Sequence, residues 1–336
     1  MIYDRYYYSK MNSDDKKAYK LIYDALQRHE PSVEVQWITD ESLLKVFEAI
    51  NLDNPHLFFV DFSSITWYDL IGKTTVELSY LYDKSKTTTL TQRVNEICNK
   101  ILLKVTGKTD FEKEVSLHDI LVRNVLYDNV AKNNVEKFRA RSNTILGVLF
   151  YKTAVCEGIA KTFKLLLNAL DIKCVVVKGK ATDDLSGNVS SDTLHAWNMV
   201  KIDGKPYHVD LTWDINLSDE KICRHDYLNL PDKDITRDHK FETDYPVCSF
   251  MDSNYFYKNN LIVNTGKDVE RIIRNAIRLK YNAAEFKLND SAIETTTDIM
   301  AIAGNCIKTA ATCQRNLSLS GTCHTEQGIC YIEWFN

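Results

Sequence analysis

The sequence predicts an α+β protein in which a helix that carries Cys156 packs against an antiparallel sheet, with a smaller α/β region on each side. Three observations support this fold class. An apolar stretch of helical length follows Cys156. Strand-forming residues flank the dipeptide Asp203-Gly204, a strong signal for a β-hairpin. Helical and strand patterns also alternate near both ends of the 336-residue chain, which is long enough for two or three domains. We therefore predict regions at 1–110, 111–245 and 246–336.

The composition excludes several classes of protein. Hydrophobic residues make up 44% and charged residues 26% of the chain, as in a globular protein with a buried core. The formal charge of −4 gives no basic surface for nucleic acid, so we expect no nucleic-acid partner. No apolar run is long enough for a membrane span.

The nine cysteines are odd in number and form no CxxC motif. This pattern fits a reduced, cytoplasmic protein better than a disulfide framework. Pairing is conceivable in one place, among Cys306, Cys313, Cys323 and Cys330. The N-terminus lacks the apolar segment of a signal peptide. We expect a cytoplasmic protein; the alternative is an extracellular or cell-surface protein whose signal segment is absent here.

The N-terminal region alternates between helices and strands. Residues 13–29 carry an apolar stripe at helical spacing, with Ser13 as the predicted N-cap. The other elements predicted here are a helix from 40 to 50 capped by Asp40, strands at 33–38, 57–61, 64–70 and 74–82, and a helix at 90–105.

The core and the C-terminal region follow. A helix begins near Ser116 and another covers 156–170; a strand at 173–179, a polar loop at 181–193 and a hairpin at 194–213 complete the core. The C-terminal region reads as a βαβαββ-like unit. Its predicted elements lie at 261–264, 267–280, 283–288, 291–313 and 316–335.

The hairpin brings a histidine and a carboxylate together. If Asp203-Gly204 forms the turn, Ile202 pairs with Lys205, and the side chains of His195, Trp197, His208, Asp210 and Thr212 share one face. His195 and Asp210 are then diagonal neighbours within reach of a hydrogen bond. Asp214 is the other diagonal neighbour. We favour Asp210, because a charge in mid-strand is costly unless it has a task, whereas an Asp at a strand end is ordinary.

Cys156, His195 and Asp210 are the residue types of a cysteine nucleophile with its base. The helix N-terminus and a nearby imidazolium would both lower the pKa of the Cys156 thiol from its reference value of about 8.5. Asp210 would fix the imidazole tautomer. A single buried cysteine, histidine or aspartate is usually structural, but the three together on a helix start and one sheet face favour catalysis.

Four further residues are candidates around this cleft. The backbone N–H of Cys156 would stabilise an oxyanion, with Asn143 or Tyr151 as a second donor. Gly158 would leave room for a substrate chain close to the backbone. Trp197 either walls the cleft or packs in the core.

Three separated motifs resemble those of the transglutaminase-like superfamily. They are the nucleophile run Val155–Lys161, the histidine run His195–Val200 and the aspartate run Tyr207–Asp214. Flanking segments resemble bacterial members of that group, at Leu117–Val122 with Tyr127-Asp128, at Tyr227–Leu230 and at Asp238-His239. Ile159 departs from the pattern, since bacterial relatives usually carry Tyr there.

The resemblance covers about residues 111–245 and implies a papain-like core. It implies Cys156 as nucleophile, His195 as base and Asp210 as the residue that orients it. We expect no cofactor, and we recognise no calcium site like that of the animal enzymes. Cys223 and His225 lack partners at zinc spacing, so we expect no metal site, and we expect His118 to be a packed or capping residue.

These features predict a thiol-dependent acyl-transfer enzyme that acts on amide or peptide carbonyls through a thioester. We favour hydrolysis, as in an amidase or peptidase, with a protein or peptide substrate. The alternatives are a protein-glutamine transglutaminase with an amine acceptor, and a non-enzymatic module that binds peptide or polysaccharide on a transglutaminase-like fold.

Overall fold

The computed structural model describes residues 5–132, 134–182, 192–219, 222–241, 245–289, 296–310, 318–324 and 327–335. The chain divides into two compact units. The first comprises Met1–Gly179 and Leu194–Tyr227, and the second Lys180–Thr193 and Leu228–Asn336. The predicted boundaries near residues 110 and 245 lie inside these units and stay predictions.

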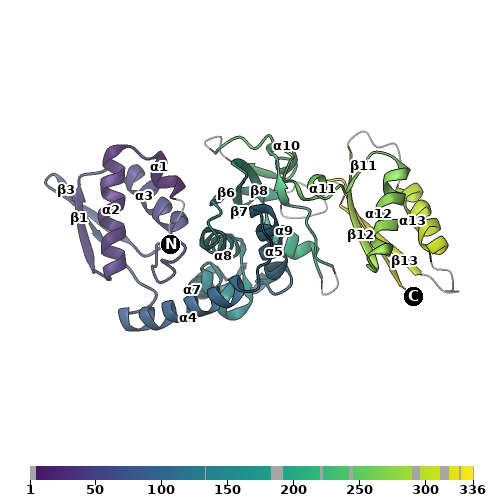
Figure 1. Ribbon diagram of the computed structural model, residues 1–336. Coiled ribbons are helices and arrows are strands. Elements are labelled where there is room, and N and C mark those ends of the chain that lie inside the picture. The colour runs from purple at the N-terminus through teal and green to yellow at the C-terminus, as the bar shows by residue number, and fades with distance from the viewer. Residues whose placement is uncertain are drawn as a thin grey trace. The chain divides into compact units, whose positions relative to one another are not determined.

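The first unit begins with short helix α1 (Tyr6–Lys10) and continues with α2 (Ser13–Arg28), α3 (Asp40–Asp53) and a three-stranded antiparallel sheet (Figure 1). Its strands β1 (Ser32–Gln36), β2 (Thr66–Leu70) and β3 (Lys73–Glu77) have the order β1-β3-β2. The helix predicted at 13–29 is confirmed, but Asn12 rather than Ser13 is its cap, because the Asn12 side chain accepts the N–H groups of Asp14 and Asp15.

The strand predicted at 57–61 is wrong. The N–H of Leu57 bonds to the carbonyl of Asn54, and the N–H of Val60 to that of Leu57, so the run forms tight turns, and its β pairing is a single bridge between Val60 and Tyr80. Its apolar side chains are nevertheless buried. An apolar run of this length does not distinguish a buried turn from a buried strand.

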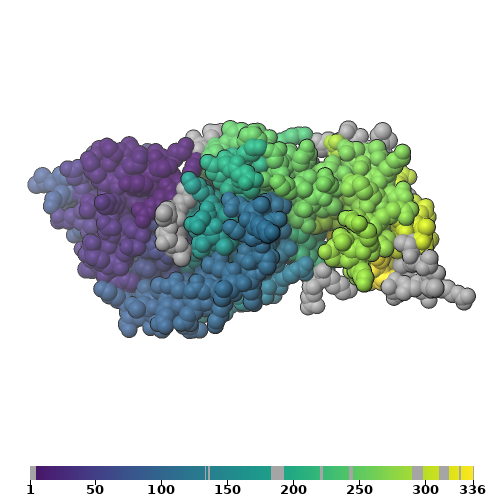
Figure 2. Space-filling model, in the orientation of Figure 1, coloured from purple at the N-terminus to yellow at the C-terminus, as the bar shows by residue number. Residues whose placement is uncertain are grey.

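Helices α4 (Lys84–Leu102) and α5 (Asp110–Val122) follow, and each begins earlier than predicted. The space-filling view shows the blue residues near 100 as an exposed band along the first unit (Figure 2). Helix α5 starts at Asp110 because Thr109 and Glu112 form a capping box. The chain then passes through β4 (Leu126–Tyr127), α6 (Asn129–Lys132), α7 (Val135–Ser142), a π-helical turn (Gly147–Tyr151) and β5 (Thr153–Ala154).

The core of the first unit is built on helix α8 (Cys156–Ala169) and three adjacent strands. These are β6 (Cys174–Thr182), β7 (Asp192–Ile202) and β8 (Lys205–Val209). The hairpin register is the predicted one, since Ile202 pairs with Lys205 and Met199 with His208. Asp203 and Gly204 both have positive φ, at 49° and 82°, as a two-residue turn of this kind requires. Of the predicted loop at 181–193, residues 183–191 lie outside the described part of the chain.

The predicted end of the second hairpin strand, at Trp213, is wrong. Strand β8 ends at Val209, and helix α9 (Leu211–Leu217) follows at once. The cause is Asp210, whose side chain accepts the N–H groups of Thr212 and Trp213 and so caps the helix. A cap of this kind outweighs the strand preference of the residues after it.

The second unit contains short elements followed by the predicted βαβαββ arrangement. The short elements are β9 (Leu228–Leu230), α10 (Asp232–Ile235), β10 (His239–Phe241) and α11 (Tyr255–Lys258). The arrangement itself comprises β11 (Ile262–Val263), α12 (Gly266–Arg278), β12 (Ala283–Leu288), α13 (Thr296–Ala310), β13 (Ser318–His324) and β14 (Ile329–Phe335), with the sheet order β11-β12-β14-β13. Helices α12 and α13 lie side by side on this sheet and share one apolar core with it (Figure 1).

Cys323 and Cys330 face each other on β13 and β14 and form a disulfide. Cys306 is a buried free thiol, and Cys313 lies outside the described residues. Within the described part of the chain, no helix has the length and apolarity to cross a bilayer. The combination of helices with antiparallel sheets confirms the predicted α+β class.

Candidate active site

Cys156 is the first residue of helix α8. The preceding residue, Val155, has extended backbone, and Glu157 adds a negative charge in the first turn, where the helix dipole favours it. The side chain of Cys156 is half-buried beside Ala160, Val176 and other apolar residues of the core. The nucleophile candidate therefore lies where the helix start meets the sheet.

His195 and Asp210 are in contact, as the hairpin register predicted. The distance between His195 Nε2 and Asp210 Oδ2 is 2.6 Å. Asp210 is fully buried, and the His195 side chain is 7% exposed. The other carboxylate oxygen, Oδ1, accepts the N–H groups of Thr212 and Trp213. Both oxygens of Asp210 are thus held, so the carboxylate has a fixed orientation toward the imidazole.

The surroundings of His195 favour its charged form. Burial alone would lower the pKa of the imidazole, but the Asp210 carboxylate and the contact with Cys156 outweigh it and raise the pKa to about 10. Because Nε2 points to Asp210, Nδ1 is the ring nitrogen that can exchange a proton with the sulfur. The three side chains therefore form one continuous Cys–His–Asp contact.

Trp197 and His208 lie beside this contact. Trp197 is 1% exposed and donates its indole N–H to His208 Nδ1 over 3.0 Å. Its ring stacks on His195, with centroids 6.0 Å apart. Of the two predicted alternatives for Trp197, the buried packing position is the one observed. The Asp214 alternative is excluded for His195, because Asp214 bonds to His118 instead.

The expectation for Gly158 was wrong. A Cβ at this position would overlap the carbonyl oxygen of Ser142 and touch that of Thr144. The space beside Gly158 is therefore filled by the protein's own backbone, and a substrate chain has no room there. Glycine is needed because helix α8 approaches this loop closely.

The profile of the transglutaminase-like superfamily matches residues 89–211, a segment that includes Cys156, His195 and Asp210. This segment belongs to the transglutaminase-like superfamily. The match agrees with the resemblance seen in the three motifs. At the level of the superfamily, it indicates thiol-dependent acyl transfer.

Three solved structures match part of the chain. One is a transglutaminase, 16% identical, with a TM-score of 0.30 over 54% of this chain and 50% of that chain. Another is a candidate cysteine protease from Cytophaga hutchinsonii, 16% identical, with a TM-score of 0.27 over 44% of this chain and 61% of that one. A third, a candidate protease from Parabacteroides distasonis, is 15% identical, with a TM-score of 0.25 over 46% and 39%. Among curated proteins, none matches the chain.

In this transglutaminase-like segment, the two weaker oxyanion candidates point elsewhere. The Asn143 side chain donates to Glu157 Oε2 over 3.5 Å. The ring of Tyr151 lies under the guanidinium of Arg141, and the residue is 56% exposed. Among the contacts described, neither side chain meets Cys156, so their part in an oxyanion hole stays a prediction.

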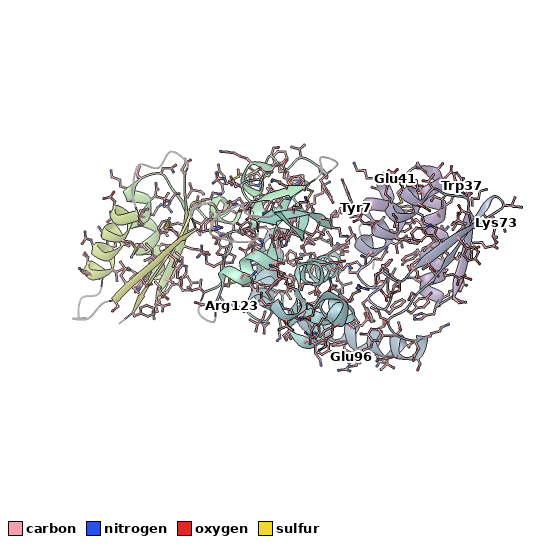
Figure 3. All side chains as sticks on the ribbon, turned by 180° about the vertical axis from the view of Figure 1, so that it is seen from behind. Tyr7, Trp37, Glu41, Lys73, Glu96 and Arg123 are labelled. Atoms are coloured by element: carbon pink, nitrogen blue, oxygen red, sulfur yellow. A yellow bond between two sulfur atoms is a disulfide. The ribbon has the colours of Figure 1, made fainter. Side chains whose placement is uncertain are left out.

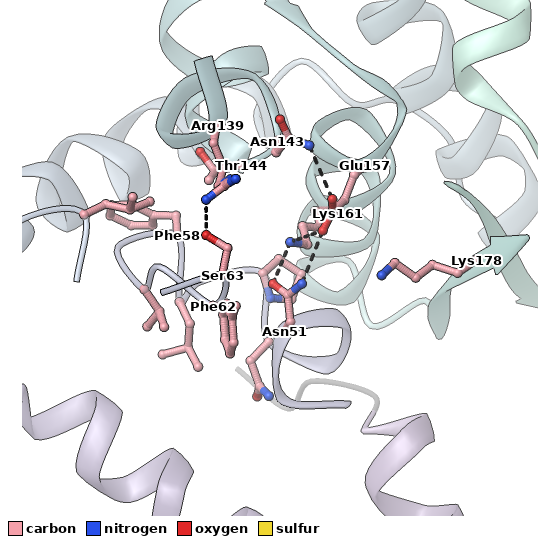
Figure 4. Close-up of a pocket in the computed structure, with 15 residues that line it drawn as sticks. Asn51, Phe58, Phe62, Ser63, Arg139, Asn143, Thr144, Glu157, Lys161 and Lys178 are labelled. Atoms are coloured by element: carbon pink, nitrogen blue, oxygen red, sulfur yellow. Dashed lines mark hydrogen bonds and ion pairs between the residues drawn. The ribbon is translucent and has the colours of Figure 1, made fainter. Parts of the chain in front are cut away.

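A cavity of about 280 Å³, lined by both apolar and charged side chains, opens next to the nucleophile's helix, on the side of Glu157 (Figure 4). Lys161 binds Glu157 at 2.7 Å and Asn51 at 2.7 Å. Burial would raise the pKa of Glu157, but Lys161 and Lys178 lower it to about 2. The cavity is therefore lined by the charged pair of Glu157 and Lys161, and Glu157 directly follows Cys156 in the chain.

Tyr7 on α1, labelled in Figure 3, packs against the same apolar cluster as Cys156. Its hydroxyl donates to the carbonyl of Val176 over 2.6 Å, and its ring joins the apolar cluster that contains Cys156. Asp53 holds α1 in place by accepting the N–H groups of Tyr7 and Tyr8. No sequence motif marked Tyr7; only the folded chain places it here.

The expectation of no metal site rested on the lack of partners for Cys223 and His225 at zinc spacing. It considered only residues close in the sequence. In the fold, His118 and Asp119 of α5 lie beside both. His118 is fully buried, which confirms that it is a packed residue.

Proposed function

We propose that this protein catalyses thiol-dependent acyl transfer on the amide or peptide carbonyls of a protein or peptide, with water as the usual acceptor. The observation that carries the proposal is the continuous contact from Cys156 through His195 to Asp210, with 2.6 Å between the imidazole and the carboxylate. A protonated His195 stabilises negative charge on the sulfur, which makes it the attacking group.

The reaction follows from these positions. The Cys156 sulfur attacks the carbonyl carbon, and the oxygen takes the electron pair of the double bond. The oxyanion collapses to a thioester as His195 passes its proton to the nitrogen of the leaving amine. Water then attacks the thioester and gives a proton to His195, so a carboxylic acid leaves and the pair of thiolate and protonated His195 is restored. Asp210 keeps the imidazole in the required tautomer throughout.

Hydrolysis is favoured over transfer to an amine because the sequence carries no feature that indicates a second substrate. The cavity beside Glu157, with its mixed apolar and charged lining, is a candidate for binding part of the peptide. If an amine resolved the thioester instead, the protein would be a transglutaminase, since the first half of the reaction is the same.

The deciding experiment incubates the protein with a glutamine-containing peptide and an amine probe and follows the products by mass spectrometry. Deamidation or cleavage without probe incorporation supports hydrolysis; incorporation supports transglutamination. The Cys156→Ala variant should form neither product, and Cys98→Ala, which removes a thiol on α4, should form the same product as the parent at the parent's rate. Full turnover by Cys156→Ala would contradict the proposal.

Iodoacetamide separates an enzyme from a binding module with the same fold. Near pH 6 we expect Cys156 to be alkylated faster than an ordinary thiol, because a neighbouring imidazolium favours the thiolate. In His195→Ala this advantage should disappear. An equal rate in the two proteins would favour the non-enzymatic module.

A further inference from the structure

Four side chains with metal-binding atoms converge in the first unit. His118 and Asp119 come from α5, and Cys223 and His225 from the segment that follows α9. Each residue offers one ligand atom, and these four atoms all lie within 4.8 Å of one another. These residues take no part in the proposed reaction, and Cys223 and His225 lie beyond the segment that matches the superfamily.

The distances among three of the four ligand atoms are close to those of a coordination shell. Asp119 Oδ1 lies 3.1 Å from His118 Nδ1 and 2.9 Å from His225 Nε2. The two imidazole rings stack, with centroids 5.1 Å apart. Around a tetrahedral zinc ion, ligand atoms at 2.0–2.3 Å from the metal are roughly 3.3–3.8 Å apart. Small side-chain rotations would therefore bring the nitrogen, oxygen and sulfur atoms to these separations.

We propose that His118, Asp119, Cys223 and His225 bind one zinc ion. Two imidazole nitrogens, a thiolate and a carboxylate oxygen are a donor set that suits zinc, whereas calcium and magnesium prefer oxygen alone. A thiolate and a carboxylate supply two negative charges, which balance the charge of the divalent ion. The two histidines bind as neutral imidazoles.

Asp214 supports the assignment through its contact with His118, one of the proposed ligands. Its Oδ2 lies 3.0 Å from His118 Nε2, and both side chains are fully buried. A zinc-bound histidine commonly gives its second N–H to a carboxylate, which fixes the tautomer and leaves the other nitrogen for the metal. Here that other nitrogen is Nδ1, the one that faces Asp119.

An ion can reach the proposed site from solvent, although the two histidine ligands are buried. The Asp119 side chain is 34% exposed, which gives an ion a route inward, while His118 and His225 are buried. Four protein ligands leave no position for substrate, so the ion is structural. It ties α5 to residues 222–227, and through His118 and Asp214 it also holds α9, whose cap is Asp210.

Cobalt is the sharpest probe, because a tetrahedral cobalt–thiolate site gives a charge-transfer band in the near ultraviolet and strong visible bands. We would titrate chelator-treated protein with cobalt in the Cys156→Ala background, which removes the catalytic thiol as a competing ligand. We expect both bands to saturate at about one ion per chain, and zinc to displace the cobalt. Absence of the charge-transfer band would overturn the proposal.

Variants locate the ion. Cys223→Ala should lose the charge-transfer band, and Asp214→Asn should weaken zinc binding by about 10–100-fold. Cys98→Ala is the matched control and should bind as the parent does. Metal binding that is unchanged in Cys223→Ala would overturn the proposal.

A third measurement leaves all four proposed ligands unsubstituted, so its result does not depend on whether a ligand variant folds. Zinc should slow the alkylation of Cys223 in the Cys156→Ala protein, read by peptide mass spectrometry. A rate for Cys223 that is the same with and without zinc would contradict the site. That outcome would leave the proposed reaction at Cys156 untouched, because the two sites share no residue.

Discussion

Asp210 serves two parts of the first unit with its two carboxylate oxygens. Oδ2 binds His195, and Oδ1 caps helix α9. Catalytic orientation and local folding therefore depend on the same side chain. Asparagine caps helices as well as aspartate does, so Asp210→Asn keeps the cap and removes the negative charge from the imidazole.

We predict that Asp210→Asn slows peptide turnover by about a hundredfold or more, since positioned acid–base catalysis contributes factors of this size. The variant should keep its helical circular dichroism, because the cap remains. Turnover within a factor of two of the parent would show that His195 needs no carboxylate partner.

The same pair makes stability depend on pH. The pKa of His195 is raised from 6.5 to about 10, so its stabilising effect is complete below about pH 6.5 and is lost as the pH rises toward 10. In the Cys156→Ala background, we predict that Asp210→Asn lowers the free energy of unfolding by on the order of 2 kcal/mol at pH 6. Urea titrations should find a smaller difference at pH 10. A difference that grows with pH would contradict this assignment.

The residue-scale predictions from sequence succeeded where they rested on local geometry. Asp203 and Gly204 define a turn, the turn defines the register, and the register brings His195 to Asp210. The same reasoning read Asp210 as a mid-strand residue. It missed the helix cap, because a cap and a strand end look alike until the bonds of Thr212 and Trp213 are known.

At the scale of elements, the close packing of helix α8 against the loop at Ser142 and Thr144 depends on Gly158. Gly158→Ala would place a methyl group against the backbone carbonyls of Ser142 and Thr144, which cannot move as a flexible side chain can. We predict a loss of about 1–3 kcal/mol in the free energy of unfolding. In the matched control, Gly304→Ala on α13, the new Cβ meets only Leu319 Cδ2 at 3.8 Å. That change should be neutral or stabilising, and thermal denaturation of both variants tests the contrast.

We expect helix α1 to restrict access to the nucleophile through Tyr7, because Tyr7 and Cys156 pack against the same apolar cluster. Replacing Tyr7 with Ala removes the ring from the cluster that contains Cys156 and the hydrogen bond to Val176. We predict faster alkylation of Cys156 in this variant, measured with an uncharged alkylating reagent. Tyr7→Phe, which keeps the ring, should remain close to the parent. If both variants react at the parental rate, Tyr7 does not limit access.

Element positions were predictable from sequence where a pattern was long. The amphipathic helices α2, α8 and α12 and the strand β12 all lie close to their predicted ranges. The buried run at 57–61 and the start of α5 were not, because a short apolar segment fits several structures and a capping box needs Thr109 and Glu112 to be read together.

At the scale of the whole molecule, the partners that sequence spacing missed come from long-range contacts. Asp119 and His225 are 106 positions apart in the chain and 2.9 Å apart in the fold. No local spacing rule joins them. The superfamily match is likewise limited to residues 89–211, so the roles of the remaining residues are inferred from their contacts in the structure.

The proposed zinc ion should make the stability of the molecule depend on metal concentration. A ligand that binds only the folded chain stabilises it by about 2.7 kcal/mol at a free concentration of about 100 times its Kd. We predict that a chelator lowers the Tm of the parent protein and that added zinc restores it. In Cys223→Ala the Tm should not respond to either treatment; a parallel response in both proteins would place the ion elsewhere.

The short turn at Asp203-Gly204 also has a consequence for the order of folding. His195 and Asp210 are 15 positions apart and meet as soon as one hairpin closes, and closing so small a loop loses little chain entropy. Cys156 must join them across a longer stretch of chain. We therefore expect a refolding molecule to form its imidazole–carboxylate pair before Cys156 joins it.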